Sequence, residues 1–176
     1  MKSSTRAASK RRLQPQSAES QAPDSCAQRD TLKASEALHP VCPGCNSRGR
    51  LVPTITVKNL ARDHTQVDAE ATYSFCATAT CDIVYFARAQ VLLRTEIKVR
   101  VGAKESIDPI PLCYCFDYDL QTLCHAVATN RDALLLDRIK AEVQRGFCAC
   151  NVKNPSGQCC LGDLHRARNQ LRQEQR

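Results

Sequence analysis

The sequence has no tryptophan and a single methionine, and only 5% of its residues are aromatic. A chain so poor in large side chains builds a limited apolar core, so we expect another source of stability. No uncharged apolar run approaches the 18 or so residues of a membrane-spanning helix, so we expect no membrane span. The N-terminal stretch carries charge but no apolar leader segment, and we therefore expect a cytoplasmic protein.

Patterns of a catalytic site are also missing. We find no Ser/His/Asp arrangement, no phosphate-binding glycine loop and no carboxylate pair at a recognisable spacing. None of the four histidines has a second ligand at a suitable distance along the chain, although His39, three residues before Cys42, is the best substitute ligand among them. We therefore predict a protein that is not an enzyme.

Cysteine is the residue that the chain has in abundance, with twelve in 176 residues. A disulfide framework would require an oxidising compartment, whereas a cytoplasmic chain keeps its thiols reduced. Short-spaced cysteine pairs in such a chain indicate metal binding or redox chemistry. We take bound metal as the interpretation and keep disulfides as the alternative.

The formal net charge of +7 at first suggests a nucleic-acid partner. However, residues 1–38 hold seven Lys and Arg against four Asp and Glu, and thiolates bound to metal would lower the charge of the remainder. Residues 1–38 have little apolar content and are predicted to be a disordered basic tail, in which Cys26 receives no role. No basic patch with interleaved aromatics follows, so we do not expect a nucleic-acid partner.

The pattern after residue 38 predicts an α+β fold made of two lobes. Short strands are predicted around residues 72–76 and 82–87, and a further strand in 94–104, where Ile97, Val99 and Val101 alternate with charged residues. The stretch after the first cysteine turn is rich in β-branched residues, which favour extended structure. We predict a zinc-binding β lobe at 39–105, a Pro-bearing connector at its end, and a helical lobe at 106–176.

Apolar periodicity predicts two helices in the second half, and a third is expected at the end of the chain. Leu120, Leu123, Cys124 and Val127 form one stripe, with Asp117 or Asp119 as the N-cap. The next stripe runs through 135, 139 and 143 and ends at Gly146, the expected C-terminal cap. A basic helix closes the chain after residue 160. Cys124 lies on an apolar stripe and is interpreted as a small buried hydrophobe.

The four cysteines between residues 40 and 85 have the spacing of a zinc site. A CxxC turn and a CxxxxC loop, about 30 residues apart, supply two sulfurs each and can face one another around a tetrahedral ion. Protein ligands fill all four positions, so we predict a structural Zn²⁺ held by Cys42, Cys45, Cys76 and Cys81. A redox-active CxxC is the alternative, but its usual βαβ context is missing.

A second set of cysteines flanks the two predicted helices. Cys113 and Cys115 form a CxC pair that can bind one iron of a [2Fe-2S] cluster, which takes two thiolates per iron. After about 32 residues of two-helix sequence come four more cysteines, at 148, 150, 159 and 160, which can supply the other pair. The pattern alone leaves open which two of these four are used.

Several motifs carry a resemblance to known families. The CxC pair, the helical hairpin and the cysteines after it resemble the bacterioferritin-associated ferredoxin fold, although the final loop here is longer. "CPGC", "YSFCATATCDIVYF", "VRVGAKE", "PLCYCF" and "CNVKNPSGQCCLGD", in this order between Val41 and Leu164, resemble the N-terminal zinc and [2Fe-2S] domain of CopZ-type copper chaperones. The resemblance implies cluster ligation by Cys113, Cys115, Cys150 and Cys160, and zinc at the first set.

This resemblance implies one-electron transfer linked to copper or heavy-metal handling, with an unidentified redox partner or copper-handling protein. Family members carry a further ferredoxin-like domain with a CxxC copper site, which we do not find after Cys160, so copper delivery by that route is not expected. Two alternatives stay open: a structural zinc-binding adaptor, and direct Cu(I) binding or sensing through the loop that holds Cys148 and Cys159.

Overall fold

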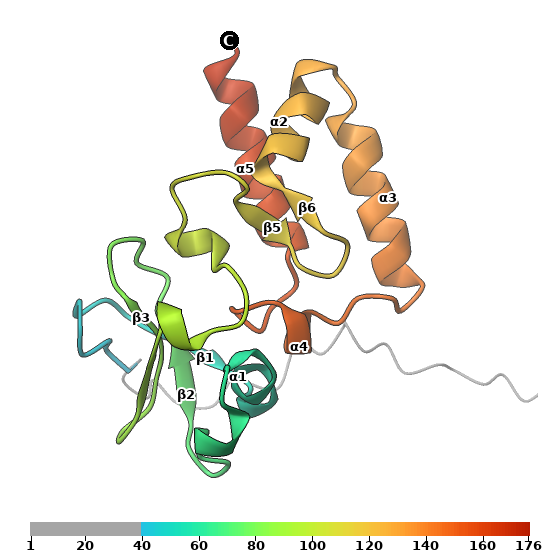
Figure 1. Cartoon of the computed structure of the whole chain (residues 1–176). Helices are drawn as coiled ribbons and strands as arrows, with labels where there is room; N and C mark the ends of the chain where they lie inside the picture. The colour runs from blue at the N-terminus through green and yellow to red at the C-terminus, as the bar shows by residue number, and fades with distance from the viewer. Residues whose placement is uncertain (1–39) are drawn as a thin grey trace, which may run out of the picture.

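The structure, a computed structural model, describes residues 40–176, which form a β-sheet lobe followed by a helical region (Figure 1). The fold is therefore α+β, as predicted. The predicted tail at 1–38, together with Cys26 and His39, lies outside the described residues. Within residues 40–176, every helix is too short or too polar to cross a bilayer.

A four-stranded antiparallel sheet organises the first lobe. Its strands follow one another in space as they do in sequence, and their bounds are β1 Arg50–Val52, β2 Tyr73–Phe75, β3 Ile83–Phe86 and β4 Val91–Leu93. The predicted strands around 72–76 and 82–87 are confirmed as β2 and β3. Because β2 and β3 are neighbours, the cysteines that flank them are brought to one end of the sheet.

The β-branched stretch after β1 forms a helix instead of extended structure. Helix α1 spans Thr54–Leu60 and follows Pro53, whose fixed φ suits a helix start. Thr56, Val57 and Leu60 are buried on one face of α1. Burial of this face outweighs the weak strand preference of Thr, Val and Ile, because propensity amounts to only a few tenths of a kcal/mol per residue. A 3-10 turn, η1 (His64–Gln66), follows.

The predicted strand within 94–104 is wrong. This segment holds two 3-10 turns, η2 (Arg94–Glu96) and η3 (Gly102–Lys104), and Ile97 makes a single isolated bridge to Ala61. Two short-range contacts explain the difference. The Glu96 carboxylate accepts the Leu93 N–H at 2.7 Å, and Glu105 pairs with both Arg94 and Arg100, which folds the segment back on itself.

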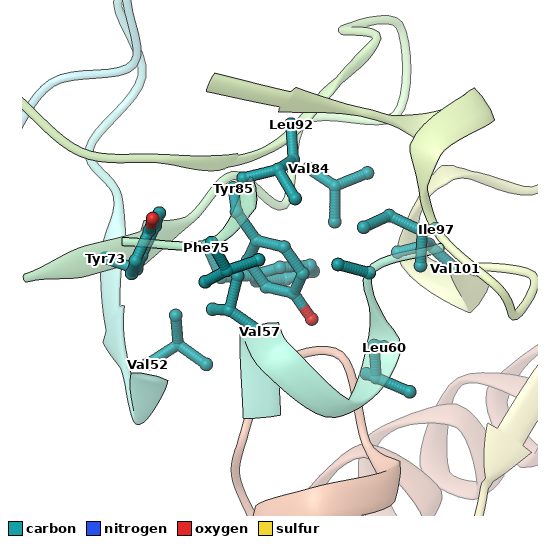
Figure 2. Close-up of a cluster of buried hydrophobic side chains, with 12 residues drawn as sticks. Val52, Val57, Leu60, Tyr73, Phe75, Val84, Tyr85, Leu92, Ile97 and Val101 are labelled. Atoms are coloured by element: carbon teal, nitrogen blue, oxygen red, sulfur yellow. The ribbon is translucent and has the colours of Figure 1, made fainter. Parts of the chain in front are cut away.

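A larger apolar core than composition predicts fills the space between the sheet and α1 (Figure 2). The ring of Tyr85 lies in its middle, tilted against Phe75 with ring centroids 6.1 Å apart. Three of the chain's eight aromatic residues, Tyr73, Phe75 and Tyr85, pack here, so a low overall content still supports a packed lobe. The buried members are Val52, Val57, Leu60, Ala61, Val67, Tyr73, Phe75, Val84, Tyr85, Leu92, Ile97 and Val101.

The second half is helical, with one small hairpin at its start. Its elements are β5 Pro111–Cys113, β6 Tyr118–Asp119, α2 Leu120–Ala128, α3 Asp132–Gln144, α4 Cys150–Lys153 and α5 Leu161–Glu174. The three longer helices are confirmed. The Asp119 carboxylate caps α2 by accepting the Thr122 N–H at 2.8 Å, and Gly146 ends α3 at φ +80°. The hairpin and α4 were not predicted.

Helix α4 joins the two halves by lying against α1 (Figure 1). The Thr56 hydroxyl donates to the Asn151 carbonyl, and the Asn59 amide donates to the Val152 carbonyl at 3.1 Å. A segment that carries candidate metal ligands of the second set is therefore fixed to the first lobe.

Candidate metal centres

The first cysteine set converges at one end of the sheet. Cys42 and Cys45 lie in a turn before β1, Cys76 directly follows β2, and Cys81 precedes β3. The Sγ atoms of Cys42 and Cys81 are 3.8 Å apart, and those of Cys45 and Cys76 are 3.6 Å apart. All four ligand atoms lie within 4.8 Å of one another.

This geometry fits a tetrahedral zinc ion. A Zn–S bond of about 2.3 Å places any two sulfurs of a tetrahedral site roughly 3.8 Å apart, close to the 3.8 Å between Cys42 and Cys81 and the 3.6 Å between Cys45 and Cys76. Cys42, Cys76 and Cys81 are buried, and Phe86 and Ile83 pack against them. Four protein sulfurs leave no coordination position for water, so the donor set is that of a structural site rather than a catalytic one.

Neighbouring hydroxyls favour the thiolate form of Cys45. Its Sγ lies 3.4 Å from Thr78 Oγ1, and hydrogen bonding with the Thr78 hydroxyl and then with Ser47 lowers the Cys45 pKa to about 5. Burial has the opposite effect on Cys42 and raises its pKa to about 12. An ion bound to all four sulfurs supplies the positive charge that a buried thiolate such as Cys42 requires.

The second cysteine set also comes together, from three separate elements. Cys113 ends β5, Cys115 lies in the following turn, Cys150 begins α4, and Cys160 is the N-cap of α5. Their sulfurs form a chain of contacts. Cys115 and Cys150 are 3.4 Å apart, Cys150 and Cys160 are 4.0 Å apart, and Cys160 and Cys113 are 3.1 Å apart.

The cysteines of the second half differ in exposure to solvent. Cys113, Cys150 and Cys160 are 5% exposed or less and belong to the apolar core of the helical region, whereas Cys159 is exposed and Cys148 half-buried. Cys124 is half-buried on α2, so its interpretation as a small buried hydrophobe holds only in part.

Hydrogen bonds among the sulfurs of the second set lower the pKa of two of the thiols and raise the pKa of the other two. The pKa of Cys150 falls to about 3 because the Cys115 thiol donates to it, and the pKa of Cys113 falls to about 7 because the Cys160 thiol donates to it. The donors, Cys115 and Cys160, have raised pKa values for the same reason. The Ala149 N–H also donates to Cys115 Sγ at 3.2 Å.

The loop between Cys150 and Cys160 is held by Asn154. The Asn154 side chain accepts the Ser156 N–H at 3.0 Å and donates to the Gln158 carbonyl at 2.8 Å, and the Gly157 N–H donates to the Asn154 carbonyl at 2.8 Å. These bonds make residues 154–158 a compact turn. Its Ser156 and Gly157 N–H groups bond to Asn154, whereas a cysteine sulfur, that of Cys115, accepts the Ala149 N–H.

A cleft of about 640 Å³ opens beside Cys113, between α1 and the β5–β6 hairpin. Three basic residues, Lys98, Arg100 and Lys153, line it together with Asp117 and Asp119. The cleft gives a small molecule or a partner side chain an approach to one residue of the second cysteine set.

Comparison with known proteins supports the zinc assignment. Residues 39–98 match a sequence family described as a zinc binding domain, the zinc-binding domain of CopZ. The chain is 31% identical over 125 residues to the copper chaperone CopZ of Archaeoglobus fulgidus, a match that covers 71% of this chain and 60% of that protein. The chain therefore spans less than two thirds of that copper chaperone.

One solved structure is matched over almost its whole length. The X-ray structure of the Archaeoglobus fulgidus CopZ N-terminal domain superposes with a TM-score of 0.63 at 31% sequence identity, over 72% of this chain and 96% of that one. The matched family, the compact four-cysteine set and the shared fold agree with one another. The chain belongs to the family of CopZ-type N-terminal domains, with a zinc-binding site at Cys42, Cys45, Cys76 and Cys81.

Proposed function

We propose that this protein carries single electrons through a [2Fe-2S] cluster and that this electron transfer serves copper or other heavy-metal handling. The proposed cluster ligands are Cys113, Cys115, Cys150 and Cys160. The proposal includes a division of the chain near residue 105 into a zinc lobe and a cluster-binding lobe, with the zinc in a structural role.

The observation that carries the proposal is the convergence of four thiols from two stretches about 35 residues apart in sequence. Three sulfur–sulfur contacts of 3.1 to 4.0 Å link them, and each is much longer than the bond of about 2.05 Å in a disulfide. A shared inorganic centre would account for four clustered thiols of which three are buried and none forms a disulfide. A [2Fe-2S] cluster takes four cysteine thiolates and supplies one-electron redox chemistry.

The protein itself would tune such a centre through its surroundings. Ala149 provides a backbone N–H directed at Cys115, and Cys160 lies at the start of α5, where free N–H groups and the helix dipole favour a thiolate. Cys113, Cys150 and Cys160 share a buried apolar cluster with Leu123, Ile139 and Leu164, and this packing keeps water away from their sulfurs. Hydrogen bonds and burial of this kind set the reduction potential of a cluster.

The copper-handling part of the proposal rests on the similarity to the protein of Archaeoglobus fulgidus. The matched protein of Archaeoglobus fulgidus is named a copper chaperone, and it extends beyond the part that this chain covers. We propose that the present chain supplies the redox function, for example the reduction of a metal ion before a separate chaperone or other copper-handling protein binds it. The cleft beside Cys113 supports this role because a partner side chain bound in it would lie next to one residue of the second cysteine set.

Direct Cu(I) binding is the second candidate, favoured by the exposure of Cys159 next to the buried Cys160. Soft thiolates select Cu(I), and an exposed thiol is accessible to an incoming ion. Cu(I) titration of the purified protein separates the two roles. Uptake that the double variant Cys148→Ser, Cys159→Ser abolishes would favour direct binding, whereas unchanged uptake would exclude this site.

Spectroscopy tests the electron-transfer proposal. Protein purified without oxygen should be red-brown, should lose visible absorption on reduction by one electron, and should then give an electron paramagnetic resonance signal. The variant Cys113→Ser should lose the colour and retain zinc. A colourless wild-type protein that contains two zinc ions would support the adaptor role instead, and loss of both metals from Cys113→Ser would contradict the two-lobe division.

A further inference from the structure

Lys104 is a buried lysine beside the zinc site. Its side chain belongs to η3 and is 3% exposed. The Lys104 Nζ donates one hydrogen bond to the Thr78 carbonyl at 2.9 Å and another to the Cys81 carbonyl at 2.8 Å. Both acceptors lie in the loop between β2 and β3 that supplies two zinc ligands, so the ammonium group ties two points of this loop together.

Among residues 40–176, no carboxylate pairs with Lys104, although its neighbour Glu105 binds Arg94 and Arg100. A buried ammonium group is costly unless a negative charge compensates it. Zinc held by four thiolates carries a net charge of about −2, which can supply such compensation. The hydrogen bond to the Cys81 carbonyl places the ammonium group against the backbone of a zinc ligand.

The same turn contacts the second cysteine set. The Gly102 N–H donates to the Tyr114 hydroxyl at 2.8 Å, and that hydroxyl donates to the Arg100 carbonyl at 3.1 Å. Tyr114 is the residue between Cys113 and Cys115. A Cβ atom on Gly102 would lie 2.0 Å from the carbonyl oxygen of Pro111, the first residue of β5, so the backbone of η3 and that of β5 are in close contact.

We propose that Lys104 is the countercharge of the zinc–thiolate centre and that η3 holds the Cys113–Cys115 turn in place through Tyr114. Lys104 and Tyr114 are then positioning residues, and η3 is a rigid bridge between the two cysteine sets. The part that concerns Lys104 rests on the zinc site alone, whereas the part that concerns the Cys113–Cys115 turn rests on the proposed [2Fe-2S] function.

Zinc release tests the first part without any contribution from iron. The full chain, purified without oxygen, is mixed with an excess of a chromogenic chelator, and the rate of zinc transfer is recorded. Removal of a group that orients metal ligands typically weakens metal binding by about 10- to 100-fold, so Lys104→Met should release zinc faster by that order. Lys104→Arg, which keeps the charge, should restore most of the retention.

The matched control is Lys98→Met. Lys98 is exposed and donates to the Asn59 carbonyl at 2.9 Å, away from the zinc ligands. The Lys98→Met variant should release zinc at the wild-type rate. Equal release rates for Lys104→Met and Lys98→Met would overturn the countercharge assignment, as would failure of Lys104→Arg to retain zinc better than Lys104→Met.

Tyr114→Phe tests the bridge, with Tyr118→Phe as its control because no hydrogen bond of the Tyr118 hydroxyl is present in residues 40–176. We expect Tyr114→Phe to speed zinc release several-fold and to shift the electron paramagnetic resonance signal of the reduced protein, while Tyr118→Phe changes neither. Unchanged zinc release in Tyr114→Phe would overturn the bridge. Should no preparation contain iron, the cluster proposal fails, and the zinc-release rates still decide the inference.

Discussion

The phenolic hydroxyl of Tyr85 donates a hydrogen bond to the carbonyl oxygen of Pro155 at 2.8 Å, and this contact joins the zinc lobe to the loop between Cys150 and Cys160. Tyr85 is a central residue of the sheet, fully buried and four residues after the zinc ligand Cys81. The loop therefore takes its position partly from the core of the other lobe. The two cysteine sets are distinct in sequence but connected in structure.

The first prediction concerns this contact. Tyr85→Phe leaves the Pro155 carbonyl buried without its donor, and an unsatisfied buried acceptor typically costs about 1–3 kcal/mol. We expect a lower free energy of unfolding by that amount, measured by denaturant titration of the metal-loaded protein. Tyr118→Phe is the control and should unfold as the wild type does. An unchanged midpoint for Tyr85→Phe would show that the contact does not stabilise the loop.

A second prediction concerns the close approach of Gly157 to the zinc lobe. Gly157 has φ +67°, and a Cβ atom there would lie 2.7 Å from Pro53 Cδ and 2.9 Å from Val52 Cγ2. Gly157→Ala should therefore destabilise the protein by more than about 1 kcal/mol, through both strain and steric overlap. Thermal unfolding measures the effect.

Gly162→Ala is the matched control for this change. Gly162 lies in α5, where an added Cβ atom would come no closer than 3.8 Å to the Arg166 side chain. Alanine favours a helix over glycine by up to about 1 kcal/mol, so this variant should be as stable as the wild type or more so. Equal destabilisation by both changes would contradict the packing described for Gly157.

A third prediction distinguishes the two adjacent cysteines at the start of α5. Cys160 is 1% exposed and contacts both Cys113 and Cys150, whereas Cys159 is exposed. Cys160→Ser should lose bound iron, while Cys159→Ser should keep it at the wild-type level. Iron analysis of both variants, prepared together without oxygen, makes the comparison. Iron lost from Cys159→Ser and retained in Cys160→Ser would reverse the assignment.

A fourth prediction concerns pH. Arg172 of α5 binds the buried Asp132 carboxylate at the start of α3 and holds its pKa below the ordinary value of 3.8. Because the folded pKa is lower than the unfolded one, the stabilisation is present above about pH 4 and is lost as the pH falls through the folded pKa. Asp132→Asn should lower the unfolding midpoint at neutral pH, and the difference from the wild type should shrink in acid. A constant difference down to pH 2 would contradict this pairing.

Much of the fold could be predicted from local patterns. The helix periodicity, the Asp119 cap and the Gly146 terminus are short-range signals, and each appears in the structure. Helix α1 could not be predicted in this way, because its β-branched residues are helical only when Thr56, Val57 and Leu60 are buried against the sheet. The alternation of residues 97–101 was misleading for a related reason, since charge pairs at Glu105 fold that segment back.

The candidate metal ligands could be predicted because cysteine spacing reports local turns. The residues that support them could not, because their contacts span long sequence separations. Lys104 is 23 residues from Cys81, and Tyr85 is 70 residues from Pro155. A lysine and a tyrosine carry no sequence signal for such contacts. The choice of Cys150 and Cys160 over Cys148 and Cys159 also remains a prediction, supported by burial and by resemblance to the family.

The most direct test of the account is the metal and sulfide content of the full chain purified without oxygen. The account predicts one zinc ion, two iron ions and two acid-labile sulfides per chain, with zinc alone remaining in Cys113→Ser. A compactly folded protein that contains zinc but neither iron nor sulfide would contradict the proposed electron carrier.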